Sequence, residues 1–348
     1  MHHRLLSPHH ALILLLPFAV SCSSHEKSTK STIANGSLPP VTNGARAGDS
    51  TFRSRVHVPN EMGRVPVLMY HLFGDHESTW GRERGNFRRD LELLYERGYR
   101  PVNMVDVLDK NIDLPAGLSP VVITFDDASP SQFRYIERDG KLLIDSTSAV
   151  GIWLDFAKTH PGWGNKAVFC MLPAASAGHA FFGDGKYDGQ KKEWRLLKVK
   201  HLADMGFELC DHTLWHAQLD KYSDAVVQEQ IARGALAIDS AVPGYRIRSF
   251  ALPLGVWPKN RALAKSGSWT DPKTGRTVTY DFDAIFEVWG QPVPSPYDPV
   301  FNPLSIQRIR VTGNALTNVL DRLDRTSDRY VSDGNPSIVA QKQLVATP

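Results

Sequence analysis

The chain has 348 residues, which is enough for one large α/β domain or two small ones. Hydrophobic residues make up 42% of it and charged residues 22%, the balance of an ordinary soluble globular protein rather than a disordered chain. The formal net charge is only +3 and the Lys and Arg residues are scattered, so we expect no nucleic-acid partner. No pattern indicates oligomerisation, and a monomer is expected.

The beginning of the chain is typical of a secretion signal. Arg4 supplies a positive start, and residues 11–20 form an apolar core that is too short to span a bilayer comfortably. The segment 1–22 ends in small residues before Cys22, as at a bacterial lipoprotein processing site, although Ala19 stands where Leu is common. We favour a lipid anchor on Cys22, with cleavage by an ordinary signal peptidase as the alternative. The prediction is an extracytoplasmic, membrane-anchored lipoprotein of the bacterial cell envelope (periplasm or outer membrane), secreted if it is not lipidated.

Composition divides the rest of the chain into three parts. Residues 23–62 are rich in Ser, Thr, Gly, Asn and Pro, which predicts a flexible tether. Residues 63–326 carry the apolar patterns of a folded domain. The polar tail 327–348 is expected to be disordered or loosely attached.

Predicted strands and helices alternate along the folded domain. Apolar runs predict strands at 65–70, 121–123, 166–172, 207–210, 250–252, 284–289 and 306–311. Apolar periodicity and capping residues predict helices at 86–97, 193–205, 223–241 and 314–323, with a further helix and loop within 131–160. A hairpin is expected at 266–280. The alternation predicts an α/β fold with a mainly parallel sheet.

Two adjacent carboxylates, Asp126 and Asp127, follow the strand at 121–123. Sites form at the carboxyl ends of strands in parallel sheets and barrels. Neighbouring carboxylates repel each other and persist most easily when a cation neutralises one of them. The alternative is an ordinary turn, since Asp is common at strand ends and Pro130 follows shortly.

A pair of histidines, His212 and His216, follows another predicted strand. Their i, i+4 spacing predicts that both imidazoles lie on one face of a helical turn. Together with one Asp they form a three-ligand set that leaves a position open for water, as in catalytic metal sites. Such a set suits zinc, with cobalt, nickel or iron as alternatives.

A backbone bend ends the apolar run at 250–252, where Pro253 and Gly255 form a Pro-x-Gly sequence. Such a bend brings main-chain N–H groups near a ligand, and an ordinary surface turn is the alternative. Arg248 precedes the run and Trp257 follows the bend.

These motifs together resemble the polysaccharide deacetylases with the NodB-homology domain (carbohydrate esterase family four). The family motif Thr-Phe-Asp-Asp-Gly is matched by residues 124–127, with Ala128 in place of the Gly. The motif His-Ser/Thr-x-x-His is matched at 212–216, and a third motif ends in the Pro-x-Gly of 253–255. The resemblance covers about residues 63–312. It implies a polysaccharide deacetylase domain folded as a distorted (β/α) barrel with seven or eight mainly parallel strands.

The resemblance also implies a role for each motif residue. Asp126 would be the general base, while Asp127, His212 and His216 would bind the metal and Thr213 would support the turn of the second His. The metal would polarise the amide carbonyl and lower the pKa of water, and a backbone N–H would help to hold the oxyanion. The implied reaction hydrolyses a non-peptide C–N bond, releasing acetate from an N-acetylated polysaccharide of the peptidoglycan or poly-N-acetylglucosamine type.

The chain departs from the family pattern at two places. The family has an Arg next to the base where Ala251 stands here, and Arg248 is the nearest replacement. The family also supplies a late His as general acid, whereas no His follows His216. In the layout of the biofilm poly-N-acetylglucosamine deacetylases, a Tyr-His strand end comes first, which makes His71 the candidate general acid. A structural His at a strand end is the alternative.

Several functional alternatives stay open. A catalytically weak or inactive glycan-binding lipoprotein of the same fold fits the two departures, and an O-acetyl (acetylxylan) esterase fits the motifs. Trp257 would stack on a sugar ring if it is exposed, and a buried Trp is the alternative.

Cys170 and Cys210 both fall in predicted buried strands. An extracytoplasmic protein permits a disulfide, but a buried Cys also behaves as a small apolar residue. We expect two free thiols and no role for either as a metal ligand.

Overall fold

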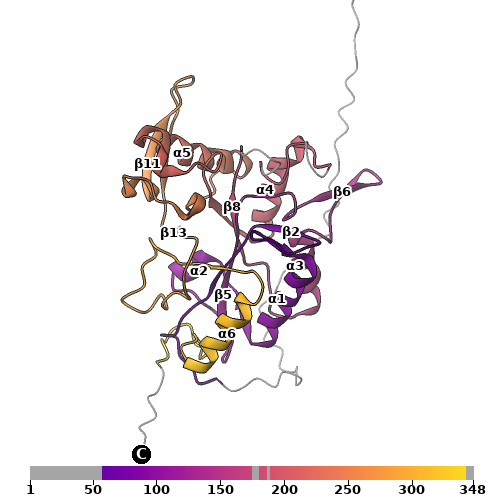
Figure 1. Ribbon diagram of the computed structural model, residues 1–348, viewed down its shortest axis with the longest axis vertical. Coiled ribbons are helices and arrows are strands. Elements are labelled where there is room, and N and C mark those ends of the chain that lie inside the picture. Colours follow the sequence, from indigo (N-terminus) through magenta and orange to yellow (C-terminus); the bar gives the residue numbers. More distant parts are fainter. Residues whose placement is uncertain (1–56, 175–179, 186–188, 342–348) are drawn as a thin grey trace, which may run out of the picture.

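The computed structural model describes residues 57–174, 180–185 and 189–341 (Figure 1). The signal segment, Cys22 and residues 23–56 of the tether lie outside these residues, so the predicted lipid anchor stays a prediction. None of the helices in the described ranges has the length and apolar character needed to cross a membrane.

A curled parallel sheet forms the centre of the fold. In the described residues its strands follow the order β13 (Ala284–Phe286), β10 (Ser249–Ala251), β9 (Glu208–Asp211), β8 (Val168–Met171), β5 (Ser119–Phe125), β1 (Val67–Tyr70) and β14 (Ile309–Arg310), and β4 (Tyr99–Pro101) also pairs with the beginning of β5. Every pairing in this sheet is parallel. The predicted α/β class and distorted barrel are confirmed.

One short segment contacts both edges of the sheet. Ile306 bridges Phe286 in parallel at the β13 edge, where Glu287 N donates to Ile306 O at 2.8 Å. Three residues later, Ile309 pairs with Leu68 at the β1 edge. The barrel is therefore completed by a few irregular residues rather than by a continuous pair of strands.

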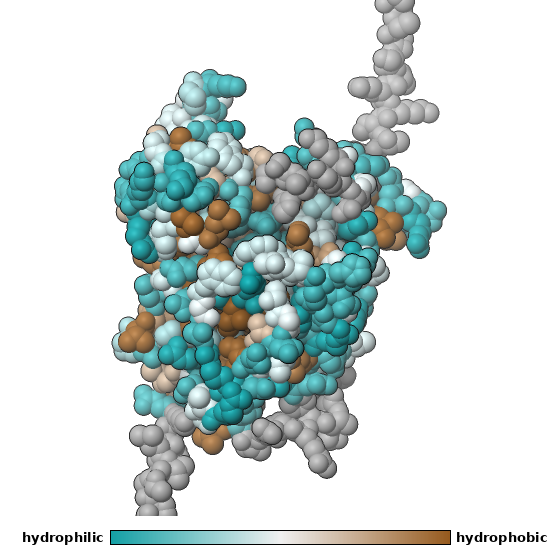
Figure 2. All heavy atoms as spheres, in the orientation of Figure 1, coloured by the Kyte–Doolittle hydropathy of each residue, from teal (hydrophilic) through white to brown (hydrophobic). Residues whose placement is uncertain are grey.

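Six α-helices surround the sheet within the described residues, and each predicted helix is present. They are α1 (Arg84–Glu96), α2 (Met104–Leu108), α3 (Ala149–Thr159), α4 (Arg195–Asp204), α5 (Asp224–Ala241) and α6 (Ala315–Thr326). Ser148 and Ser223 cap α3 and α5 by accepting backbone N–H bonds. Figure 2 shows that hydrophobic residues on one face form separate patches among hydrophilic ones, because the helices turn their apolar sides inward.

The two faces of the central strands carry different residues. Along β5, Val121, Ile123 and Phe125 pack against the helices, whereas Val122 lies in a second core inside the barrel. Side chains alternate along a strand, so the inward face of β5 continues from Val122 through Thr124 to residue 126. On β9 the same alternation turns residues 208, 210 and 212 inward.

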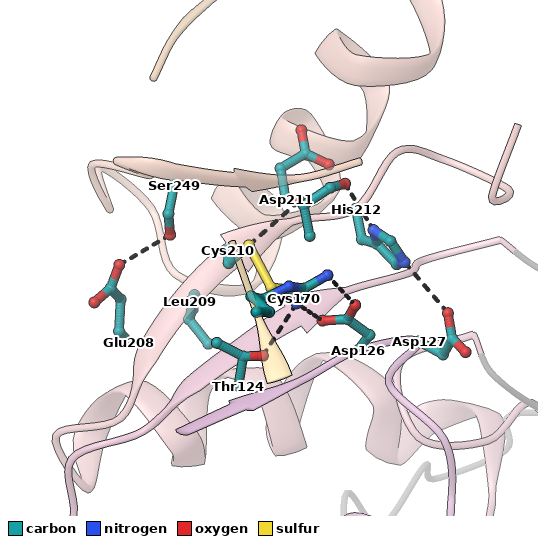
Figure 3. Close-up of a disulfide and its surroundings, with 12 residues drawn as sticks. Thr124, Asp126, Asp127, Cys170, Glu208, Leu209, Cys210, Asp211, His212 and Ser249 are labelled. Atoms are coloured by element: carbon teal, nitrogen blue, oxygen red, sulfur yellow. Dashed lines mark hydrogen bonds and ion pairs between the residues drawn. A yellow bond between two sulfur atoms is a disulfide. The ribbon is translucent and has the colours of Figure 1, made fainter. Parts of the chain in front are cut away.

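A disulfide joins Cys170 and Cys210 inside the barrel (Figure 3). The expectation of two free thiols is therefore wrong. The strands β8 and β9 are neighbours, and their register places the two Cys residues opposite each other with Cα atoms 4.2 Å apart. Burial in separate predicted strands does not reveal this register, because the residues are 40 positions apart in the sequence.

Two antiparallel hairpins and one short parallel ladder extend from the barrel. The segment expected to hold only a helix and a loop contains the antiparallel hairpin β6 (Tyr135–Arg138) and β7 (Lys141–Ile144) before α3. The predicted later hairpin is present as β11 (Ser266–Thr270) and β12 (Thr277–Asp281). A short parallel ladder, β2 (Leu72–Gly74) with β3 (Gly81–Glu83), follows β1.

The beginning of the polar tail is packed rather than loose. Tyr330 is buried in the inner core, and Arg329 donates a hydrogen bond to Ser119 Oγ at 2.6 Å. Val331 bridges Asn60, which was assigned to the tether. The composition of the segment did not predict this packing, because few of the residues that form it are apolar.

Glu208 is an ionisable residue inside the barrel whose burial makes the stability of the fold depend on pH. It is buried, and it accepts hydrogen bonds from Ser249 Oγ at 2.9 Å and from Val105 N at 3.0 Å. Burial outweighs these bonds and raises the pKa of Glu208 from 4.5 to about 7. Because the folded protein binds this proton more tightly, stability falls as the pH rises from 4.5 to about 7, by roughly 3 kcal/mol.

We expect Glu208→Gln to flatten this part of the stability curve, measured by urea unfolding between pH 4.5 and pH 8. The same change at exposed Glu96 is the control and should leave the wild-type curve unaltered. Equal slopes for wild type and Glu208→Gln would contradict the assignment.

Candidate active site

Asp126 lies at the carboxyl end of β5 and points into the barrel, where Arg308 meets it. Arg308 Nη1 and Nη2 each donate to one Asp126 oxygen at 2.7 Å. The guanidinium also donates to Thr124 Oγ1 at 3.0 Å and, through Nε, to Glu287 O at 2.7 Å. Arg308 and Asp126 are both almost fully buried, so this is a desolvated ion pair, and two further guanidinium N–H groups are hydrogen-bonded.

The ion pair keeps Asp126 ionised. Burial by itself raises the pKa of this carboxyl, but the charge of Arg308, with smaller effects of His212 and His71, lowers it below its ordinary value. A carboxylate that stays charged in a buried site can accept a proton at neutral pH.

Asp127 turns away from its neighbour toward the His pair (Figure 3). Its Oδ1 lies 3.3 Å from His212 Nε2 and 3.6 Å from His216 Nε2. One ligand atom from each of the three residues fits within a group no wider than 4.8 Å. The structure therefore brings together the three predicted metal ligands.

The two histidines converge from a loop, so the predicted helical turn is wrong. Thr213 and His216 have positive φ angles of 68° and 64°, which no α-helix contains. Asp211 Oδ1 accepts the Thr213 N–H at 2.8 Å, and Thr213 Oγ1 accepts the His216 N–H at 3.1 Å. These two bonds shape the loop, and Gly234 on α5 leaves room for the Asp211 carboxylate, which a Cβ would approach to 2.3 Å.

The polar atoms at the centre of this group fit a metal ion. His212 Nδ1 lies 2.8 Å from Ala251 O, so this nitrogen carries the proton and Nε2 presents a lone pair. That lone pair faces Asp127 Oδ1, and both atoms are buried without a hydrogen-bond partner. Burial lowers the pKa of His212, but the nearby carboxylates outweigh this effect and raise it, so the local field favours a positive charge. Two imidazole nitrogens and one carboxylate oxygen are a donor set that suits zinc.

His71, the candidate general acid, lies beside Asp126. Its Nε2 is 3.9 Å from Asp126 Oδ2, and its side chain is 11% exposed. Burial lowers the pKa of His71 despite the neighbouring carboxylates, so the resting imidazole is neutral at pH 7. On its other side, the ring lies 4.8 Å from the ring of Trp80.

Two residues of the predicted substrate set are engaged elsewhere. Arg248 precedes β10, at the opposite end of the barrel, and pairs with Asp283 at 2.5 Å and Asp109 at 2.7 Å. Trp257 is half-buried, with its Nε1 donating to Glu287 at 3.1 Å. Neither side chain is brought into the site.

The Pro253–Gly255 turn does border the site, because it follows β10 directly after the carbonyl that holds His212. Leu254 and Gly255 have positive φ angles of 58° and 68°. A Cβ on Gly255 would lie 2.8 Å from Val288 Cγ2, so this close approach requires glycine.

The sequence prediction missed Arg308 as the partner of Asp126. Its only signal was an Arg within the predicted strand at 306–311, a position where a buried charge needs a partner. Arg308, in the segment that joins the two sheet edges, thus stands next to Asp126 in place of the arginine that Ala251 replaces.

Comparison with known proteins supports the family resemblance. The family model described as polysaccharide deacetylase matches residues 161–267, which include the His pair and the Pro-x-Gly turn. The chain resembles the polysaccharide deacetylases, as its motifs predict. Among curated protein sequences, none matches the chain significantly.

Two solved structures show the same fold. The Streptococcus pyogenes deacetylase PplD, in complex with acetate, is 17% identical over 74% of this chain and 97% of its own, with a TM-score of 0.52. IcaB from Ammonifex degensii is 19% identical over 76% of this chain and 98% of its own, with a TM-score of 0.51. At these identities the likeness concerns the fold.

Replacement of Arg308 tests the buried ion pair. We expect Arg308→Met to lower the free energy of unfolding by about 3–5 kcal/mol, because Asp126 is left buried and unpaired. The double variant with Asp126→Asn should recover part of this loss. Urea denaturation of all variants measures it, with Arg233→Met, which removes an exposed pair with Glu229, as a control expected to cost less than about 1 kcal/mol. A loss no larger than the control's would contradict the pairing.

Metal binding tests the division between the two carboxylates. We expect about one zinc per chain in the wild type by elemental analysis after dialysis, and far less in His212→Ala. Asp126→Asn should retain the metal, because its carboxylate faces Arg308 rather than the His pair. Loss of zinc from a folded Asp126→Asn protein, or full retention in His212→Ala, would contradict this ligand assignment.

Proposed function

We propose that the protein is a metal-dependent hydrolase that removes acetyl groups from an N-acetylated polysaccharide. The observation that carries the proposal is a buried carboxylate, Asp126, held ionised by Arg308 directly beside the group Asp127, His212 and His216. The matching family model supports a polysaccharide deacetylase, and the bound acetate named for PplD is the product expected from such a reaction.

The metal would be held by Asp127, His212 and His216, with zinc as our first choice and cobalt, nickel or iron as alternatives. When bound, it would polarise the acetyl carbonyl and lower the pKa of water in the site. Two hydrogen bonds would orient the histidine ligands. The bond from His212 Nδ1–H to Ala251 O directs His212 Nε2 inward, and the bond from the His216 N–H to Thr213 Oγ1 fixes the loop.

Asp126 accepts the proton of the attacking water in this proposal. Arg308 keeps the carboxylate charged and fixes its orientation by two hydrogen bonds, so little reorganisation is needed. The oxygen of water adds to the acetyl carbon, the C–N bond breaks, and acetate leaves.

The departing amine needs a proton, and His71 is placed to provide it. The resting imidazole is neutral, so it must first receive a proton during turnover. Asp126, whose Oδ2 lies 3.9 Å away, holds the proton taken from water and is the nearest source. A base and an acid at this separation would pass one proton between them through an intervening water.

The site favours catalysis over binding alone. A glycan-binding protein of this fold would gain nothing from an ionised, desolvated base next to the metal ligands, which makes the inactive lipoprotein the weaker alternative. Hydrolysis of O-acetyl esters would use the same groups, so substrate tests decide between amide and ester.

The setting of this activity is proposed from the sequence. A lipid anchor on Cys22 would hold a monomeric enzyme at the membrane of the bacterial cell envelope, and the residues before the barrel would let it reach the polymer. Without lipidation the enzyme would be secreted.

Acetate release from a panel of N-acetylated and O-acetylated glycans tests the proposal. We expect release that a chelator abolishes and zinc restores, and a loss of at least about 100-fold in kcat for Asp126→Asn. No acetate from any glycan by the zinc-loaded wild type would overturn the proposed activity.

The role of His71 has its own test. We expect His71→Ala to lower kcat strongly on acetylated glycans, whose amine must be protonated, but far less on 4-nitrophenyl acetate, whose phenolate leaves without a proton. Equal losses on both substrates would make His71 a structural residue.

A further inference from the structure

Two exposed tryptophans and an arginine lie at the carboxyl-end mouth of the barrel, beside the candidate acid. The indoles of Trp80 and Trp289 are 41% and 58% exposed, and their ring centres are 6.2 Å apart. The guanidinium of Arg310 lies over both rings, with its Cζ 4.8 Å from the ring centre of Trp80 and 4.4 Å from that of Trp289. Trp80 also contacts His71, so this trio is continuous with the proposed site.

The sheet geometry explains where Arg310 points. Arg308 and Arg310 are two residues apart on one strand segment, so their side chains emerge on the same face of the sheet. Arg308 reaches Asp126 inside the barrel, and Arg310 lies one step nearer the mouth. Its register partner on β1 is Met69, two residues before His71.

Among the described residues, no carboxylate neutralises the charge of Arg310. Arg82, Arg97 and Arg308 each form ion pairs with carboxylates. No hydrogen bond or ion pair joins Arg310 to a carboxylate in the part of the chain that the structure describes. The two indoles contact the guanidinium without offering it an acceptor, and no side-chain hydrogen bond of Arg310 occurs within the described residues, so its N–H groups are available to a ligand.

These surroundings fit a particular ligand chemistry. An indole face packs against the apolar face of a pyranose ring, and a guanidinium with free donors binds a carboxylate through two parallel hydrogen bonds. Large aromatic side chains exposed together beside a catalytic group are typical of a binding site.

Resting on the proposed deacetylase function, we propose that Trp80, Arg310 and Trp289 form a subsite for a carboxylate-bearing sugar. This sugar lies next to the residue whose acetyl group is removed, so the substrate class is an acidic glycan rather than a neutral one. A lactyl ether, as on muramic acid, and a uronic acid both supply the required carboxylate.

Binding to the Asp126→Asn protein, measured by isothermal titration calorimetry with zinc present, tests the subsite without turnover. The probes are an N-acetylglucosamine–N-acetylmuramic acid tetrasaccharide, an N-acetylglucosamine–glucuronic acid tetrasaccharide, and the methyl ester of each, which removes the charge with little change of shape. We expect one acidic probe to bind at least about tenfold more tightly than its ester, and the one that does identifies the source of the carboxylate.

Variants made in the Asp126→Asn protein assign this preference to the trio. We expect Arg310→Gln to bring the ratio of acid to ester affinity close to one, and Trp289→Ala to weaken both forms of the probe. Arg325→Gln is the matched control, because it removes the same charge from the exposed end of α6 and should leave the ratio unchanged.

The outcomes separate this inference from the proposed function. Equal affinity for acid and ester, no binding of either, or a preference that survives Arg310→Gln would each overturn the subsite, whether or not the enzyme releases acetate. An Arg310-dependent preference for the acidic probe, in a protein that releases no acetate, would support the subsite and contradict the proposed deacetylase activity.

Discussion

The buried ion pair between Asp126 and Arg308 is the interaction on which both the fold and the site depend. Removing two charges from water costs several kcal/mol for each ion, and only good geometry with further hydrogen bonds offsets this cost. Here two hydrogen bonds of 2.7 Å join the pair, while Thr124 and the Glu287 carbonyl each accept a further guanidinium N–H. Because Arg308 lies between the residues that pair with the two edges of the sheet, the contact that keeps Asp126 ionised also links the barrel edges to its interior.

Around this pair the barrel interior is arranged in layers, which Figure 3 shows from the Glu208–Ser249 contact to the Asp127–His212 contact. The alternation of side chains along β9 generates this order: residue 208 lies at the amino end, Cys210 in the middle and His212 at the carboxyl end. The disulfide and small apolar residues separate the deep polar layer from the catalytic one. The site therefore forms where inward-facing positions reach the mouth, and exposure rises from 2% for His212 to 28% for His216.

Local patterns in the sequence predicted central strands and the helices, because each depends on neighbours in the chain, whereas the convergence of Asp127 with the His pair was implied by the family resemblance. They missed features that depend on register between distant strands. Arg308 is 182 residues from Asp126, and its role requires knowing that the segment before β14 joins the two edges. The Cys170–Cys210 bond and the packing near Tyr330 were not predicted for the same reason. The predicted helical turn at 212–216 was wrong for a different reason. The carboxylate of Asp211 stabilises a left-handed conformation at Thr213, which the spacing of the two histidines does not reveal.

The same left-handed geometry resolves the repulsion between Asp126 and Asp127. Asp126 ends the extended inward face of β5, whereas Asp127 has a φ of 77° and Ala128 a φ of 46°, so the chain turns sharply between the two carboxylates. One is directed to a guanidinium and the other to two imidazoles, and these partners lower the pKa of each carboxyl against the effect of burial. Glycine would adopt the conformation of Ala128 more easily, which explains the preference at this position in the family motif. The strained turn gives two adjacent carboxylates separate electrostatic partners, and the proposed division into one base and one metal ligand requires this separation.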